Sequence, residues 1–302
     1  METNVRSRGK SSVYEEVTTQ ILALIEADAG TYHAPWHVPV GMAAQPTNAC
    51  THAEYRGVNI LGLWMQAMRR SFPSHLWASY RQWQQLGAQV RKGERGALVI
   101  FYKRIETKPS EEQDHERSTG LRYVARASRV FNAAQVNGYV PEEIPVQAPS
   151  ERYLEVEAFV EALGANIGHG FAAAKYRHDT DSIEMPERSW FLASSDRPPK
   201  ESYYAVLLHE LTHWTGAPHR LNREFGKRFG DKTYAFEELV AELGAAFMCA
   251  AFGISTAPRA DHAAYVSHWL EVLNRDPKAI FTAASKAQEA FEHLSYLATR
   301  NA

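Results

Sequence analysis

The sequence predicts an α+β fold in two parts: an N-terminal part that combines helices with a β-hairpin and antiparallel sheet, and a C-terminal part that is mainly helical. The length of 302 residues and the hydrophobic content of 45% are sufficient for two globular cores. Apolar runs separated by glycines lie between residues 87 and 131, whereas helical periodicity dominates after residue 200. A proline-containing stretch over 136–150 separates the two parts and indicates a linker.

The elements of the N-terminal part follow from local patterns. Val13, Val17 and Ile21 repeat at helical spacing, and Ser12 with Glu15 forms a capping-box pattern at the start of this helix. In chain order we expect a polar, disordered tail over 1–11, a helix over 12–27, a helix over 56–70, a hairpin over 87–103 with a charged glycine turn, and a partner strand over 123–131.

The C-terminal part contains longer helical patterns. We expect a helix over 151–163, two short strands between residues 175 and 186, and helices over 201–215 and 234–252. Gly216 is placed to stop the helix over 201–215. The chain is therefore divided into a disordered tail (1–11), a first domain (12–137), a linker (138–150) and a second domain (151–302).

The net charge of −2 conceals an uneven distribution. Residues 1–149 carry 17 Lys and Arg against 14 Asp and Glu, or +3, and residues 150–302 carry 16 against 21, or −5. Within the first part, residues 1–108 hold 13 basic and 8 acidic side chains, or +5. A basic first part and an acidic second part indicate different partners for the two.

Aromatic and basic side chains are mixed in the first part, which is typical of proteins that bind single-stranded nucleic acid. Four of the seven tryptophans fall within the first 83 residues, namely Trp36, Trp64, Trp77 and Trp83. Bases stack on aromatic faces while arginine and lysine contact phosphates. From the residues alone we favour a purely structural role over DNA binding, because an excess of +5 is modest for a nucleic-acid-binding protein. The candidate DNA-binding residues are Trp77, Tyr80, Arg81, Arg91, Lys92 and Arg95.

The cysteines and the apolar runs indicate in which cellular compartment we expect the protein. Cys50 and Cys249 are far apart and no C-x-x-C pattern occurs, which excludes a cysteine zinc site and fits a reducing, cytoplasmic compartment. The polar N-terminus lacks the apolar segment of a signal peptide. The apolar runs are short and interrupted, so we expect no membrane partner.

The segment that carries most chemical information is 207–216, which contains H-E-x-x-H within an apolar helical pattern. His209 and His213 are four residues apart, so both imidazoles lie on one face of a helix and can bind one metal ion. Glu210, beside the first histidine, can act as a general base on a metal-bound water. We expect Zn²⁺, with Mn²⁺ or another divalent ion as the alternative.

A catalytic zinc usually has three protein ligands, and two residues compete for the third position. Glu238 lies on the next predicted helix, and Glu242, one turn later, can hydrogen-bond a ligand histidine from outside the ligand set. His219 instead completes the pattern H-E-x-x-H-x-x-G-x-x-H. That pattern also needs a methionine turn, and Met248 lies inside a helical pattern. We favour Glu238 over His219, and Glu242 or Glu237 is the remaining alternative.

Several blocks of the sequence resemble the antirestriction ArdC family. Those in the second part are HELTHWTG at 209–216, RLNR at 220–223 and YAFEELVAELGAAF at 234–247, together with segments at 265–270 and 279–285. Those in the first part are YRGVN at 55–59, QVRKGE at 89–94, and Phe131-Asn132 with Gln135. The resemblance covers nearly the whole chain in order, and its long blocks are specific.

This resemblance implies a single-stranded-DNA-binding domain joined to a zincin-like metallopeptidase domain, in a protein of conjugative plasmids that protects incoming DNA from host restriction. It implies that Glu238 is the metal-binding glutamate, whereas His219 departs from the family pattern. It also shifts the interpretation of the first part from a structural role to DNA binding. From the charge difference between the two parts we hypothesise that DNA binding brings the peptidase domain to its substrate, a host restriction protein or another DNA-bound protein. The alternative is a protein that coats DNA and uses its metal only structurally.

Overall fold

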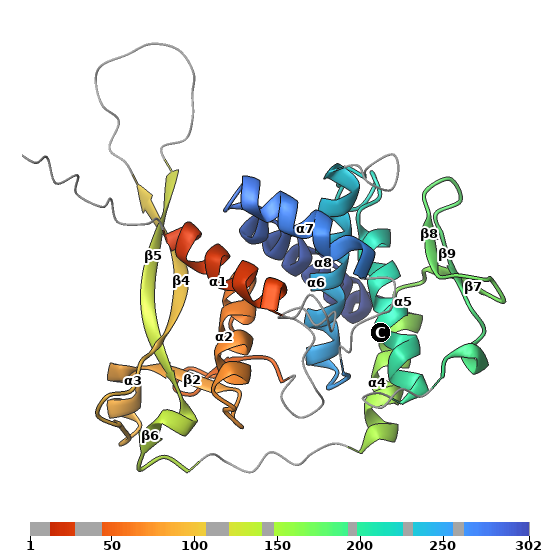
Figure 1. Cartoon of the computed structure of the whole chain (residues 1–302). Coiled ribbons are helices and arrows are strands. Elements are labelled where there is room, and N and C mark those ends of the chain that lie inside the picture. Colours follow the sequence, from red (N-terminus) through yellow and green to blue (C-terminus); the bar gives the residue numbers. More distant parts are fainter. Residues whose placement is uncertain are drawn as a thin grey trace, which may run out of the picture.

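The computed structural model describes residues 13–27, 44–106, 121–140, 148–192, 198–225, 232–255 and 263–301. Within them the fold is α+β, as the sequence predicts: an N-terminal half (residues 13–140) holds a four-stranded sheet, and a C-terminal half (residues 148–301) is mainly helical (Figure 1). The predicted disordered tail, Trp36 and residues 141–147 of the predicted linker lie outside the described residues.

The N-terminal half is organised around a sheet with the strand order β1-β2-β5-β4. β4 and β5 form a long antiparallel hairpin, in register from Ala97 opposite Val130 to Glu106 opposite Leu121. The predicted partner strand over 123–131 is thereby confirmed. The elements of this half are α1 (Val13–Ala27), β1 (Thr47–Asn48), α2 (Val58–Arg69), β2 (Leu76–Ser79), α3 (Tyr80–Gln85), β3 (Gln89–Val90), β4 (Ala97–Glu106), β5 (Leu121–Asn132), the 3₁₀ helix η1 (Ala133–Gln135) and β6 (Val136–Asn137).

The predicted hairpin over 87–103 is wrong, because β3 pairs with β6 and not with β4. Gln135, which is fully buried, explains the difference. Its side-chain NH2 group donates to the carboxylate of Glu94 at 2.9 Å and to the backbone oxygen of Arg95 at 3.1 Å. Its backbone carbonyl oxygen accepts a hydrogen bond from the backbone N–H of Arg91. These contacts hold the charged turn against η1, some 40 residues away in sequence, and no local pattern predicts them.

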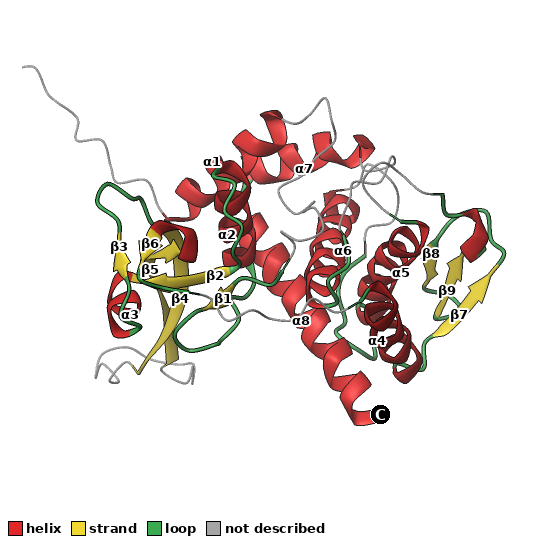
Figure 2. Cartoon of the chain, turned by 90° about the horizontal axis from the view of Figure 1, so that it is seen from below, coloured by secondary structure: helices red, strands yellow, loops and turns green. Residues whose placement is uncertain are grey.

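The C-terminal half places a small sheet beside α5 (Figure 2). Its strand order is β7-β9-β8, so β8 is an edge strand. The predicted helices over 151–163, 201–215 and 234–252 correspond to α4, α5 and α6. The elements are α4 (Pro149–Ala162), β7 (Asn166–His169), β8 (Lys175–Arg177), β9 (Ser182–Met185), the 3₁₀ helix η2 (Arg188–Trp190), α5 (Pro199–Thr215), α6 (Lys232–Ala251), α7 (Ala263–Arg275) and α8 (Ala279–Asn301).

The local sequence explains where α5 begins and ends. Pro199 occupies the first helical position, where its missing N–H costs no hydrogen bond, and Gly216 caps the end. A Cβ at Gly216 would collide with the ring of Phe225, so the close packing of the following loop requires glycine there. From Tyr203 onward α5 is buried on almost every side, which is why its apolar residues do not form one narrow stripe.

Helix α6 lies between two hydrophobic clusters and joins the halves. One of its faces packs with α1, α2, α7 and α8 through residues that include Leu243 and Phe247. Another face packs with α5 and the small sheet through Met248 and Cys249. Because α6 is fixed from both sides, side chains on its α5-facing surface have little freedom to move. No helix among the described residues is long and apolar enough to cross a membrane.

Candidate metal centre

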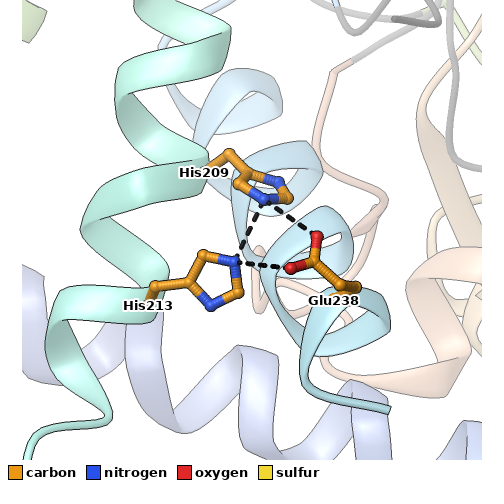
Figure 3. Close-up of side chains that lie close together, drawn as sticks. All are labelled: His209, His213 and Glu238. Carbon is orange, nitrogen blue, oxygen red and sulfur yellow. Dashed lines mark hydrogen bonds and ion pairs between the residues drawn. The ribbon is translucent and has the colours of Figure 1, made fainter. Parts of the chain in front are cut away.

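Two helices position three side chains around one point. His209 and His213 project from one face of α5, and Glu238 faces them from α6 (Figure 3). The two Nε2 atoms lie 3.2 Å apart, and each lies 3.5 Å from an oxygen of Glu238. Ligand atoms about 2.1 Å from a tetrahedral ion lie about 3.4 Å from one another. The three side chains therefore fit a tetrahedral divalent ion and leave its fourth position for water or substrate.

Two further carboxylates orient the imidazoles. Oε1 of Glu242 lies 2.9 Å from Nδ1 of His209, and Oε1 of Glu237 lies 3.2 Å from Nδ1 of His213. A histidine that donates its Nδ1–H to a carboxylate presents its Nε2 lone pair to an ion, and its ring orientation is fixed. Glu242 thus has the position expected from the sequence. Glu237 has the same position toward the other histidine, which the sequence did not indicate.

Arg223 compensates the buried charge of Glu237. Its guanidinium lies 2.8 and 3.0 Å from the two carboxylate oxygens and also donates to Oγ1 of Thr215 and the carbonyl oxygen of Thr212. Both charged side chains are less than 5% exposed. A buried carboxylate without such a partner would be strongly destabilising. Arg223 belongs to the RLNR block of the sequence, whose conformation after α5 could not be predicted from local patterns.

The same carboxylates determine how the imidazoles titrate when no ion is bound. Burial lowers the pKa of His209, but Glu238 and Glu242 outweigh burial and raise this pKa to about 9. The pKa of His213 rises to about 10, because Glu237 and Glu238 outweigh burial there. Burial raises the pKa of Glu238, but the two histidines hold it far below its ordinary value. The pocket therefore stabilises positive charge, whether from protons or from a cation.

Glu210 lies beside the ligand set and is 5% exposed. Its Oε2 atom accepts a hydrogen bond of 2.8 Å from the backbone N–H of Tyr176 in β8. This bond fixes the carboxylate between α5 and the edge strand of the small sheet. A buried, oriented carboxylate next to a metal site has the arrangement of a general base in metal-assisted hydrolysis.

His219 does not join this group. Its side chain is 62% exposed, and its Nε2 lies 3.3 Å from Asp181. Arg220 also contacts Asp181 and stacks on Trp214, so the loop after α5 turns away from the ligand set. The three side chains that the structure brings together are His209, His213 and Glu238.

The candidate DNA-binding residues do not form one site. Trp77 is 1% exposed and packs against Phe72, so its ring faces are not accessible to a base, and the expectation that it stacks on DNA is corrected. Trp64 and Trp83 are likewise buried, because aromatic residues in this half fill its cores. The exposed candidates are Tyr80 and Arg81 on α3, and Arg91, Lys92 and Arg95 in the turn after β3.

Comparisons with known proteins agree with this organisation. Residues 11–131 match the family model for the N-terminal domain of the anti-restriction factor ArdC, and residues 154–286 match that for a zincin-like metallopeptidase. The metal-free crystal structure of the antirestriction ArdC protein from plasmid R388 is similar, with a TM-score of 0.75 and 35% identity, over 96% of this chain and 99% of that one. The chain belongs to the antirestriction ArdC family.

Other relatives extend this ArdC assignment. The Mn(II)-bound ArdC structure from R388 has a TM-score of 0.72 and 34% identity, over 95% of this chain and 98% of that one. Uncharacterized protein y4eC of Sinorhizobium fredii is 46% identical over 96% of this chain and 93% of its own length. DNA primase TraC of Escherichia coli is 34% identical over 93% of this chain, which spans only 27% of TraC. The zincin-like model and the Mn(II)-bound relative indicate a divalent metal at the ArdC-type site.

Proposed function

We propose that this ArdC-family protein is a metal-dependent peptidase that cleaves a protein partner during antirestriction. The observation that carries the proposal is the tetrahedral spacing of His209, His213 and Glu238, with Glu210 fixed beside them. Two imidazoles and one carboxylate form a common catalytic zinc set, so Zn²⁺ is the preferred ion. Mn²⁺ is the alternative, because a related ArdC structure is described as Mn(II)-bound.

The protein's own groups suit the hydrolysis of an amide bond. A bound divalent ion supplies Lewis-acid assistance to water and to the scissile carbonyl. Glu210 accepts a proton from the attacking water and transfers it to the leaving amine. The hydrogen bond from Tyr176 keeps this carboxylate in place. The carboxylates of Glu242 and Glu237 hold the two histidines so that their Nε2 atoms face the ion.

The edge strand β8 supports a peptide as the substrate. Edge strands bind extended peptides by adding them as a further strand through main-chain hydrogen bonds. β8 lies at the edge of its sheet, and its residue Tyr176 contacts Glu210. A peptide bound along this strand would pass next to the proposed base and the metal ligands. The substrate class is therefore a protein with an accessible extended segment, such as a host restriction protein or another DNA-bound protein.

Substitution of Glu210 by glutamine tests the peptidase proposal. The amide cannot accept the proton from water, so hydrolysis of fluorescein-labelled casein should fall by at least about 100-fold. Bound zinc should remain at one equivalent, since Glu210 is not a ligand. Glu161→Gln on the exposed surface of α4 is the matched control and should retain activity. Equal hydrolysis by Glu210→Gln and the control would exclude Glu210 as the base.

A second function, single-stranded DNA binding by the N-terminal half, is supported by exposed aromatic side chains and an exposed arginine. Phe101 is 49% exposed and Tyr80 is 43% exposed, and the exposed Arg81 is adjacent to Tyr80 in α3. The similarity to a segment of a DNA primase agrees with this role. In titrations of a 20-nucleotide oligo(dT), the logarithm of the affinity should fall with the logarithm of salt concentration at a slope of about −0.7 per phosphate contact. A slope of zero would exclude phosphate contacts.

A further inference from the structure

A cleft of about 1120 Å³ lies between the two halves. Strands β2, β4 and β5, helix α3 and the loop after β1 line it from the N-terminal half, and residues between Lys278 and Glu292, most of them in α8, line it from the C-terminal half. The metal ligands are not among its lining residues. Its volume exceeds the range of about 300–1,000 Å³ typical of small-molecule sites, which favours a segment of a polymer as its occupant.

The two walls are held together by direct contacts at one end of the cleft. Arg56 forms an ion pair of 2.9 Å with Glu292 of α8, and the backbone N–H of Gly57 donates to the side chain of Gln288. Hydrophobic contacts between α2 and α8 lie beneath these polar ones. The cleft is therefore a formed feature of the fold in which α8 has a fixed position.

An exposed phenylalanine lies in the cleft. Phe101 on β4 lines it and keeps 49% of its surface exposed, although its neighbour Ile100 is buried. Amide side chains of Gln82 and Gln85 from α3 line the same cleft. Single-stranded nucleic acid is bound by this combination, because a base stacks on an aromatic ring while its edges form hydrogen bonds with side-chain amides.

Two basic side chains lie on opposite walls of the cleft, and the ammonium of one of them, Lys278, is 5.6 Å from the ring centre of Tyr14. Arg81 lines the cleft from α3 and Lys278 lines it from the start of α8, and among the described residues neither has an acidic partner. Lys278 directly precedes the 23-residue helix α8, whose first turn also lines the cleft. Asp276 already accepts hydrogen bonds from the backbone N–H groups of Lys278 and Ala279, so the side-chain ammonium of Lys278 is the main group that can bind a phosphate on this wall. Arg81 and Lys278 thus offer one phosphate-binding position on each wall of the cleft that Phe101 lines.

The acidic side chains of the cleft limit how strongly it binds phosphate. Glu54, Glu289 and Glu292 also line it, and they balance Arg56, Arg81 and Lys278 in formal charge. Glu292 is paired with Arg56, and Glu289 accepts a hydrogen bond from Ser285. Binding in this cleft must therefore depend mainly on base contacts, with few phosphate contacts and a shallow dependence on salt.

We propose that single-stranded DNA lies in this cleft, with a base stacked on Phe101 and phosphates bound by Arg81 and Lys278. The proposal rests on the proposed DNA-binding function and locates the DNA site in the cleft. Its new element is that α8, part of the metallopeptidase half, forms one wall of the DNA site. Because α8 also packs against α6, which carries Glu238, one helix contacts both the DNA strand and the metal-bearing helix.

Two substitutions, one on each wall, test the placement with the full-length chain and a fluorescein-labelled 20-nucleotide oligo(dT). Phe101→Ala should weaken binding by about 5- to 100-fold through the lost stacking. Lys278→Gln should weaken it several-fold and reduce the steepness of the salt dependence by about 0.7. The matched controls are Tyr296→Ala, an exposed aromatic of α8, and Lys286→Gln, a lysine of α8, neither of which lines the cleft. Both controls should bind like the unmodified chain.

Photo-crosslinking provides a measurement that does not depend on the folding of variants. An oligonucleotide that carries 5-iododeoxyuridine should form adducts at Phe101 and on α8 between residues 278 and 289. If Phe101→Ala and Lys278→Gln bound oligo(dT) as tightly as the unmodified chain, and the adducts formed outside the cleft, DNA binding would be retained but its placement in the cleft would be wrong. If the intact chain bound no oligo(dT), the DNA-binding function would fail together with the placement. Binding of an unstructured peptide, but not DNA, that is lost in Phe101→Ala would identify a peptide as the occupant and overturn the proposal.

Discussion

Replacing Gly244 by alanine should push α5 and α6 apart and weaken the metal centre. Gly244 on α6 faces Thr212 on α5, and a Cβ at position 244 would lie 2.6 Å from Cγ2 and 2.7 Å from Oγ1 of that threonine. Thr212 cannot rotate away without losing its hydrogen bond of 2.9 Å to the carbonyl oxygen of Leu208. Relief to 3.0–3.4 Å from Cγ2 therefore requires a separation of about 0.4–0.8 Å, the difference from 2.6 Å.

That separation is large compared with the tolerance of a metal site. The ligand atoms of the two helices are now 3.5 Å apart, close to the spacing that a tetrahedral ion needs. Functional sites tolerate displacements of about 0.5 Å, so zinc affinity should fall by about 10-fold or more. Overpacking should cost about 1–3 kcal/mol of unfolding free energy, partly offset by up to about 1 kcal/mol from the better helix propensity of alanine.

A chelator-competition titration of zinc and a urea denaturation curve measure these effects. The matched control is Gly62→Ala in α2, where a Cβ would meet only the carbonyl oxygen of Leu98 at 3.8 Å. This control should be slightly stabilised and bind zinc normally. Adding Thr212→Ala to Gly244→Ala should restore zinc affinity, since it removes both of the closest atoms. If Gly244→Ala bound zinc as tightly as the control, close packing of α5 on α6 would not determine the site.

Three further predictions concern the same centre. Arg223→Met should lower the unfolding free energy by about 3–5 kcal/mol, because it leaves the carboxylate of Glu237 buried without its ion-pair partner. The control Arg177→Met removes an exposed ion pair and should change the unfolding free energy by at most about 0.5 kcal/mol. Urea denaturation measures both values. Glu238→Gln should abolish stoichiometric zinc binding and His219→Ala should leave it intact, as measured by metal analysis after dialysis; the reverse result would assign the third ligand to His219. Zinc binding at pH 7 should release at least one proton and should tighten as the pH rises toward 10, because pKa values of about 9 and 10 keep His209 and His213 protonated in the ion-free protein. Calorimetry in buffers of different ionisation enthalpy measures this proton release. A binding enthalpy that does not depend on the buffer would contradict the prediction. The sign for stability is opposite: these raised pKa values stabilise the ion-free fold fully below about pH 6.5, and this contribution is lost as pH rises through 9–10.

Local patterns were sufficient for the parts of the site that lie within one helix. The spacing of His209 and His213 requires only that α5 be helical, and the apolar pattern predicted that helix. Glu238 and Glu242 were conspicuous because two carboxylates lie among small apolar residues in α6, an arrangement that needs partners if it is buried.

Contacts between distant segments could not be predicted in this way. Arg223 reaches Glu237 only because the loop after α5 folds back over Thr215, and nothing in the local sequence determines that path. The burial of Trp77 depends on how β2 pairs with β1 and β5 and packs on α2, so exposure could not be read from composition. The cleft likewise forms only when α8, more than 170 residues further along the chain than Phe101, packs against α2.

The proposed peptidase function has a direct consequence in cells. If the centre is catalytic, antirestriction depends on loss of a host protein, and Glu210 is the group whose removal stops that loss while metal and fold are preserved. If the chain only coats DNA, Glu210 is dispensable.

The most direct test is the transfer of unmodified plasmid DNA into a restricting recipient that carries either the intact chain or Glu210→Gln. We expect Glu210→Gln to retain zinc and oligo(dT) binding but to give no more protection than an empty vector. The level of the restriction enzyme, followed by immunoblot, should fall only with the intact chain. Equal protection by Glu210→Gln and the intact chain would contradict a catalytic role of the metal centre in antirestriction.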